Sequence, residues 1–140
     1  MYSMRVKDVM ETAKLLVAPP ETTVAKAAKL MAKKNVGAIL VVEDKQLVGI
    51  FTERDAVFRV IAKGRDVATT HIGEAMTADP IAVAPDEIFG RALLLMHDHG
   101  FRHVPVVEDG EPIGIVSSRS ALDPDMEEFV SETQRRLSLR

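Results

Sequence analysis

Apolar residues in the first quarter of the chain follow a helical period. Val24, Ala27, Ala28 and Met31 stand at positions i, i+3, i+4 and i+7, which is the apolar stripe of an amphipathic helix. Asn35 follows, and asparagine is one of the residues that tolerate the left-handed conformation at a helix end. The pattern therefore predicts a helix that ends at Asn35.

The apolar pattern then shortens to runs typical of strands. The runs "AILVV" (38–42) and "LVGIF" (47–51) flank a polar turn at 44–46, so they predict two strands joined as a hairpin. Apolar residues within 57–61 predict a second helix, and Gly64 can close it.

The same order of patterns occurs twice. The sequence "VVED" at 41–44 returns 65 positions later at 106–109, and "VAPPE" at 17–21 returns as "VAPDE" at 83–87. A repeat of this length indicates two copies of one supersecondary unit that bury their apolar faces on each other. We predict an α/β (α+β) fold of two β-α-β-β-α repeats, with repeat 1 at 1–66 and repeat 2 at 67–123.

A further helix is predicted at the C-terminus, at 124–140. It would begin near Asp125, with Glu128 as the partner in a capping box. Its mainly apolar stripe is Met126, Phe129, Val130, Thr133 and Leu137. This stripe needs a surface to cover, which either its own chain or a partner subunit can supply.

Composition narrows the class of protein. The 140 residues, 46% of them hydrophobic, suffice for one ordinary domain or two very small ones. Cysteine is absent, which excludes disulfides and thiolate chemistry, and no apolar run approaches the roughly 20 residues of a membrane span. A net charge of −3 with interspersed signs offers no broad basic face for nucleic acid. We expect a soluble, cytoplasmic protein that binds neither membrane nor nucleic acid.

Several motifs together resemble tandem CBS domains, also called a Bateman module, over about residues 4 to 123. The resemblance rests on the paired openings "KDVM" and "GEAMT", on the hairpin "RHVPVVEDG", and on the strand end "GIFTERD" at 49–55. It implies a pseudo-twofold pair of units, a cleft for an adenosine-containing nucleotide, homodimerisation, and regulation rather than catalysis. With no further domain in the chain, the regulated protein would be a partner in trans.

The acid at the strand end suits a ribose. Asp55 at a helix N-terminus could accept hydrogen bonds from both ribose hydroxyls, and Thr52 would add a hydroxyl on the same side. The alternative is structural, because Thr52 and Asp55 also match the capping box [ST]-x-x-[DE]. The two roles can coexist, since one carboxylate has two oxygens.

The phosphate would be held by the other unit. By the resemblance, Asp55 shares its pocket with Arg102, His103 and Arg119, and the adenine lies along Pro80, Ile81 and Ala82. The resemblance therefore implies a nucleotide-binding set of Ile50, Thr52, Arg54, Asp55, Pro80, Ile81, Ala82, Arg102, His103, Pro105 and Arg119. AMP is the first choice of ligand, with ATP and NAD as alternatives, and no catalytic cofactor is expected.

The second pocket departs from this pattern. Ser120 takes the place of the acid, and the pocket would face Gly37 and Ala38 with Arg54 as its only base. We predict one competent site per chain. Two other classes stay open: an interaction scaffold with an empty cleft, and an enzyme, although no nucleophile elbow or glycine-rich phosphate loop is present. A metal at "HDHG" (97–100) is not expected, because residues two apart on a helix point away from each other.

Overall fold

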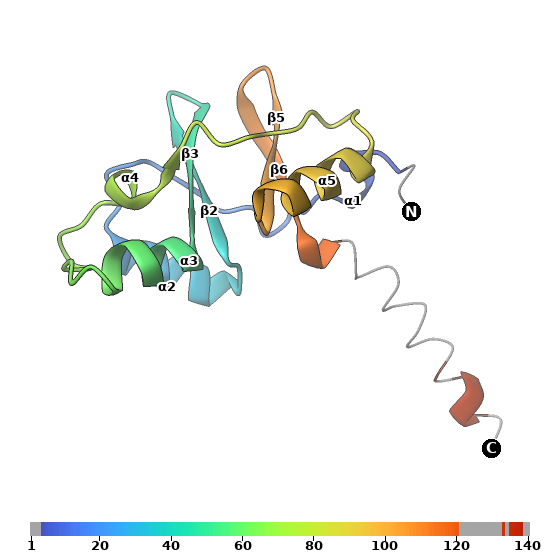
Figure 1. Cartoon of the computed structure of the whole chain (residues 1–140), viewed down its shortest axis with the longest axis horizontal. Coiled ribbons are helices and arrows are strands. Elements are labelled where there is room, and N and C mark those ends of the chain that lie inside the picture. The colour runs from blue at the N-terminus through green and yellow to red at the C-terminus, as the bar shows by residue number, and fades with distance from the viewer. Residues whose placement is uncertain (1–3, 121–132, 134, 139–140) are drawn as a thin grey trace.

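The computed structural model describes residues 4–120, 133 and 135–138 (Figure 1). The first repeat contributes β1 (Val17–Ala18), α2 (Val24–Lys34), β2 (Ala38–Glu43), β3 (Gln46–Thr52), α3 (Glu53–Asp55) and the π-helix η1 (Ala56–Ile61) that continues α3. The second contributes β4 (Thr77–Ala78), α5 (Phe89–His99), β5 (His103–Glu108) and β6 (Glu111–Ser117). Two short helices, α1 (Val6–Val9) and α4 (Ile72–Ala75), precede β1 and β4. The predicted mixed fold with two repeats is confirmed.

The first long helix has the ends that its sequence predicts. The Thr23 side chain accepts a hydrogen bond from the backbone nitrogen of Lys26 at 3.2 Å, which caps the start of α2. Asn35 closes the helix in the left-handed conformation with φ 55°. The equivalent helix α5 is closed by Gly100 with φ 71°. Of the predicted stripe, Val24, Ala27 and Met31 are buried and Ala28 is exposed, while α5 buries Phe89, Ala92 and Met96.

The strands form two sheets. One has the order β1-β2-β3-β4, with β1 parallel to β2, and the other is the hairpin β5-β6. The register shifts between Val41 and Val42 and again between Val106 and Val107, at equivalent places in the two hairpins. The predicted leading strand of the second repeat differs: Val83 makes only an isolated parallel bridge to Val106. Val83 donates to the Pro105 carbonyl at 3.0 Å and accepts from the Val107 nitrogen at 2.9 Å, so the pairing is limited to this one residue.

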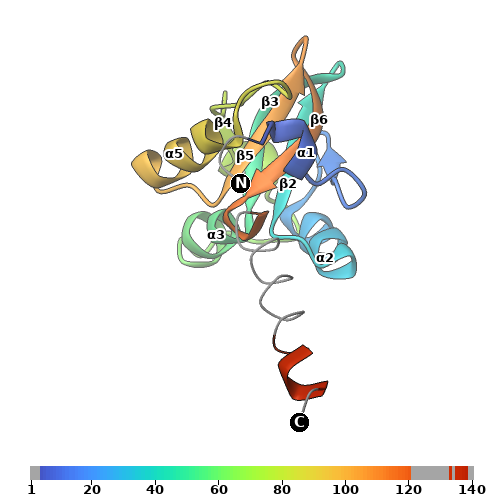
Figure 2. The ribbon, with the colours of Figure 1, turned by 90° about the vertical axis from the view of Figure 1, so that its right-hand side faces the viewer.

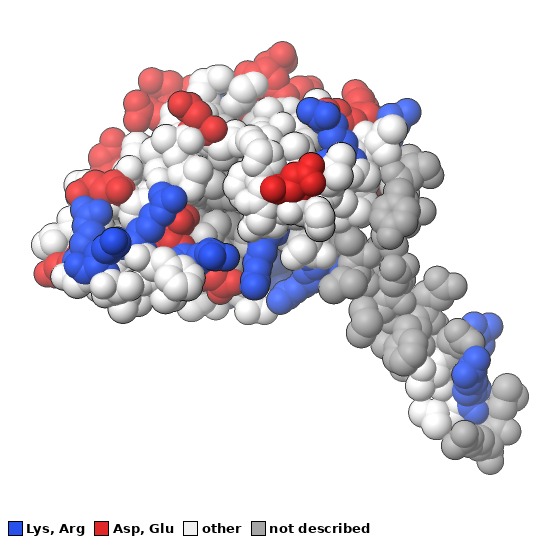
Figure 3. All heavy atoms as spheres, viewed as in Figure 1, with Lys and Arg blue, Asp and Glu red and all other residues white. Residues whose placement is uncertain are grey.

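The two hairpins lie side by side. Their turns meet where the Leu47 nitrogen donates to the Gly110 carbonyl at 3.0 Å. Figure 1 shows both turns at the upper edge of the molecule, and Figure 3 shows Asp and Glu side chains gathered along that edge. The apolar cluster between the hairpins is Leu15, Ala38, Leu40, Leu47, Ile50 and Ile115.

Each repeat lends its leading segment to the other. The Val6 nitrogen donates to the Glu87 carbonyl at 2.8 Å, and the Val6 side chain is buried with Phe89 in the core of the second unit. Conversely, Ile72 and Ala75 of α4 are buried in the core of the first unit. Figure 2 shows α1 lying over the β5-β6 hairpin. The spatial units therefore do not coincide with the repeats as they run along the sequence.

Of the predicted C-terminal helix, residue 133 and residues 135–138 are helical. Its predicted start near Asp125 and the apolar positions Met126, Phe129 and Val130 lie outside the described residues. Within the part of the chain that the structure describes, no helix has the length and apolar character needed to cross a membrane.

Candidate functional site

A cavity of about 1020 Å³ lies between the two units. Residues from the end of β3 and from α3 and η1 form one side of it. The segment around β4 and the residues between α5 and β5 form the rest. The lining is Ile50, Thr52, Glu53, Arg54, Asp55, Val57, Phe58, Arg59, Thr77, Asp79, Pro80, Ile81, His99, Gly100, Phe101, Arg102, His103 and Pro105. We call this the first cavity.

Asp55 is held at the start of α3 by Thr52. Its Oδ2 accepts hydrogen bonds from the Thr52 nitrogen at 2.9 Å and from the Thr52 hydroxyl at 3.1 Å, while the Asp55 nitrogen donates to that hydroxyl at 3.3 Å. The capping box is therefore formed, and Asp55 is only 8% exposed. A buried carboxylate fixed through one oxygen still has a second oxygen for another partner.

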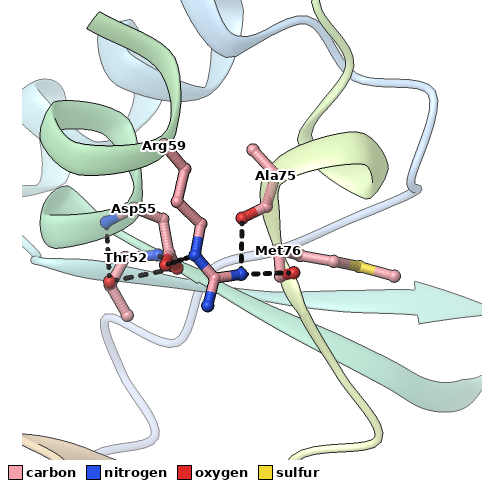
Figure 4. A network of polar contacts seen from close by, with 5 residues as sticks. All are labelled: Thr52, Asp55, Arg59, Ala75 and Met76. Carbon is pink, nitrogen blue, oxygen red and sulfur yellow. Dashed lines mark hydrogen bonds and ion pairs between the residues drawn. The ribbon is translucent and has the colours of Figure 1, made fainter. Parts of the chain in front are cut away.

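Arg59 occupies that second oxygen. Its Nε lies 3.5 Å from Asp55 Oδ1, and its Nη1 donates to the carbonyls of Met76 at 3.1 Å and Ala75 at 3.4 Å (Figure 4). The arginine thus ties the acid to the segment that follows α4. The sequence analysis missed Arg59, although the i, i+4 spacing from Asp55 on a helix is a known signal for an ion pair.

Arg54 stands at the rim of the same cavity. Its guanidinium carbon lies 5.2 Å from the centre of the Phe58 ring, in a cation–π contact. Phe58 is 57% exposed, so this contact leaves the guanidinium open to further partners. The aromatic ring restricts the arginine without neutralising its charge.

The second unit supplies Arg102 and His103 to the lining. Burial lowers the pKa of His103 below its usual value; the carboxylate of Glu53 opposes this, and the guanidinium groups of Arg102 and Arg119 reinforce it. The histidine is therefore neutral near pH 7 unless an anion approaches it.

Nine predicted site residues line the first cavity, and two do not. Those brought together are Ile50, Thr52, Arg54, Asp55, Pro80, Ile81, Arg102, His103 and Pro105, whereas Ala82 and Arg119 are not in the lining. The linings do not show the predicted exchange of the strand-end arginines: Arg54 lines the same cavity as Asp55, and Arg119 lines a second cavity with Ser120. The reason is local, because each arginine directly precedes its acid or serine on one helical turn.

The comparisons with known proteins agree with this architecture. The CBS domain family model matches residues 6–62 and 72–125. The chain belongs to the CBS domain family. It is 39% identical over 120 residues to the mitochondrial CBS domain-containing protein CBSX3 of Arabidopsis thaliana, covering 82% of this chain and 58% of that protein.

Two solved CBS structures are similar and contain adenosine compounds. The CBS domain pair of protein MJ0100, in complex with 5'-methylthioadenosine and S-adenosyl-L-methionine, has a TM-score of 0.80 at 27% identity, covering 89% of this chain and 98% of that one. The CBS domain protein PAE2072 from Pyrobaculum aerophilum, complexed with AMP, has a TM-score of 0.76 at 26% identity, covering 84% and 89%. CBS pairs similar to this chain therefore bind adenosine ligands.

The second cavity of this CBS pair measures about 700 Å³. Ser120 Oγ accepts from the Ser117 nitrogen at 3.1 Å, which repeats the Thr52 and Asp55 cap without a carboxylate. Gly37 and Ala38 line it as predicted, but so do the cations Lys14, Arg102 and Arg119. The prediction that Arg54 is its only base is therefore wrong. This cavity has Ser120 where the first has Asp55, although the carboxylates of Glu11 and Glu53 also line it.

Other residues of the first CBS cavity were not found from the sequence. They are Glu53, Val57, Phe58, Thr77, Asp79, His99, Gly100 and Phe101, besides Arg59. His99 and Phe101 stack, with ring centroids 5.1 Å apart and planes at 10°. The sequence analysis considered His99 only as a metal ligand, because Phe101 lies beyond the end of the helix. Among the described residues no group of three or more potential ligands could hold a metal ion.

Proposed function

We propose that this CBS pair is a non-catalytic regulatory module that binds an adenosine-containing nucleotide in the first cavity, with AMP as the first choice over ATP or NAD. The observation that carries the proposal is the common lining by Asp55, Arg54, Arg102 and His103. These residues combine a fixed carboxylate with two guanidinium groups and an imidazole in one hollow.

Asp55 would hold the ribose. Its Oδ2 is used by the helix cap, so the ribose hydroxyls would reach Oδ1, which Arg59 contacts at 3.5 Å. That distance is longer than a strong charge-assisted hydrogen bond, and the Arg59 side chain is 52% exposed. A ribose can therefore share Oδ1 with the arginine or displace it.

The apolar and basic parts of the lining suit the two ends of the nucleotide. Ile50, Pro80, Ile81 and Pro105 offer apolar surface for the adenine, and the backbone at Ala82 would lie beside it. Arg54 and Arg102 would meet the phosphate, because planar guanidinium groups bind phosphate oxygens in pairs. His103 would add a hydrogen bond.

The module would act as a homodimer on a partner protein in trans. On η1, Val57, Phe58 and Ile61 are 50%, 57% and 62% exposed, a cluster of apolar side chains that an interface would cover. Val57 and Phe58 also line the first cavity, so a ligand there would lie next to the proposed interface. This adjacency would let the bound nucleotide influence assembly. The cytoplasmic location remains a prediction.

Titration calorimetry with AMP and adenosine on ligand-free protein tests the proposal. We expect AMP to bind at one site per chain, because Asp55 lines only the first cavity and Ser120 takes its place in the second. Arg54→Gln should lower the affinity for AMP by about tenfold or more and the affinity for adenosine far less. This is the effect expected from losing a charged hydrogen bond of about 1.5–3 kcal/mol.

Lys14→Gln is the matched control, since Lys14 lines only the second cavity. It should leave the AMP affinity of the first cavity within about twofold. Equal losses in the two variants, or two equal sites per chain, would contradict the assignment of the cavity. Absence of binding by either ligand would favour a scaffold, and conversion of AMP during incubation would reveal an enzyme.

A further inference from the structure

Glu53 and His103 face each other across Gly37. Glu53 Oε1 lies 3.0 Å, and His103 Cε1 3.5 Å, from the point that a Cβ on Gly37 would occupy. The Glu53 nitrogen also donates to the Gly37 carbonyl at 3.0 Å, which fixes the start of α3 on β2. The absence of a side chain at Gly37 therefore leaves the space in which the carboxylate approaches the imidazole.

This carboxylate lines both cavities, together with Arg102 and His103. Glu53 is exposed, and among the described residues no lysine or arginine lies within ion-pair distance of it. Asp55, the other acid of α3, is paired with Arg59. Glu53 thus brings a free negative charge close to His103, beside the group that would meet a phosphate.

The charges of the lining are nearly balanced. Its cations are Arg54, Arg59 and Arg102, and its carboxylates are Glu53, Asp55 and Asp79. Once Asp55 and Arg59 are counted as a pair, Arg54 and Arg102 stand against Glu53 and Asp79, so the lining has no net positive charge to offer a ligand. A nucleoside monophosphate brings about two negative charges into this lining. Each further phosphate would add negative charge that Glu53 and Asp79 repel.

We propose that Glu53 is a specificity-determining residue of the first cavity, which limits how many phosphate groups the bound adenosine nucleotide carries. The inference rests on the proposed function and names its ligand class as nucleoside monophosphates rather than di- or triphosphates. Asp79 is the weaker candidate for this role, because it directly precedes Pro80 and Ile81, on the proposed adenine side.

The test replaces the carboxylate with an amide of the same shape. Affinities of adenosine, AMP, ADP and ATP are measured by calorimetry, without divalent cations, for the wild-type protein and Glu53→Gln. We expect the variant to bind adenosine within about twofold of the wild type, and AMP about two- to fivefold more tightly, the scale of one exposed charge pair. The gain should increase from AMP to ADP to ATP. Glu53→Ala should give the same order.

Glu43→Gln is the matched control. Glu43 is an exposed acid that lines neither cavity. It stands at one end of β2, whereas Glu53 lies near the other end, where Ala38 pairs with Thr52. It should leave all four affinities unchanged. If Glu53→Gln changed the affinity of all four ligands equally, the proposed role of Glu53 would be overturned, while the proposed function would stand. Failure of adenosine and AMP to bind even the wild type would overturn the proposed function and this inference with it.

Discussion

Arg59 lies against Asp55, with its Nε 3.5 Å from Asp55 Oδ1, and its Nη1 reaches the carbonyl of Met76 at 3.1 Å. One side chain therefore joins the strand-end acid of the first repeat to the segment that opens the second. The acid has a structural role in the cap and also lines the first cavity. Substitution of Asp55 should therefore lower both the free energy of unfolding and the affinity for the ligand, and the two effects can be measured separately.

Asp55→Ala should weaken the binding of adenosine by about 2 to 4 kcal/mol, the scale of losing charge-assisted hydrogen bonds. It should also lower the free energy of unfolding by about 1 kcal/mol, because the cap on α3 is lost. Calorimetry and urea denaturation measure the two effects. Thr52→Val is the control for the stability effect alone, since it removes the hydroxyl that accepts from the Asp55 nitrogen but keeps the carboxylate, and Thr52 itself lines the first cavity. If the ligand affinity of Asp55→Ala were unchanged, Asp55 would serve only to cap the helix.

Gly49→Ala should destabilise the fold by about 1–3 kcal/mol, the usual cost of overpacking. The Met76 sulfur lies across Gly49 and would collide with a Cβ there. Urea denaturation of Gly49→Ala, Met76→Ala and the double variant checks this. The double variant should be more stable than the sum of the two single effects predicts. Simple additivity would show that Met76 is not the obstacle.

Acid should destabilise the protein through His103. Because burial lowers the pKa of His103 in the folded state below its ordinary value of 6.5, the unfolded chain binds a proton that the folded chain does not. The free energy of unfolding should therefore fall as the pH drops below about 7 and through 6.5, until the folded pKa is reached. Urea denaturation at several pH values in this range measures the free energy of unfolding, which should fall less steeply with decreasing pH in His103→Gln than in the wild type. Identical slopes would contradict the shifted pKa.

Phe58→Asp should dissociate the proposed homodimer. The variant places a charge in the exposed apolar cluster of Val57, Phe58 and Ile61, where burial in an interface would be costly. Light scattering at micromolar concentration should give a dimer mass for the wild type and a monomer mass for the variant. Lys33→Asp, on the exposed side of α2, is the control and should remain a dimer. A wild-type mass of one chain, or of more than two, would contradict the proposed assembly.

The sequence by itself determined the features that depend on neighbours along the chain. The stripe from Val24 to Met31, the left-handed Asn35 and the cap between Thr52 and Asp55 involve residues within a turn or two of one another. The hairpins follow from alternating apolar runs and a polar turn. The 65-residue repeat then predicted a second helix and hairpin, and the structure confirms α5 and β5-β6, whose register shifts after Val106 as that of β2-β3 does after Val41.

Only the tertiary structure decided which segments share a cavity. The repeat cannot show that α1 is buried in the second unit and α4 in the first, because both units offer equivalent apolar sites. Nor could it show that Arg54 and Arg119 each line the cavity of their own strand end. Such contacts depend on how the units pack to bury Ala38, Leu40 and Ile50 between them, and burial has no fixed spacing along the chain.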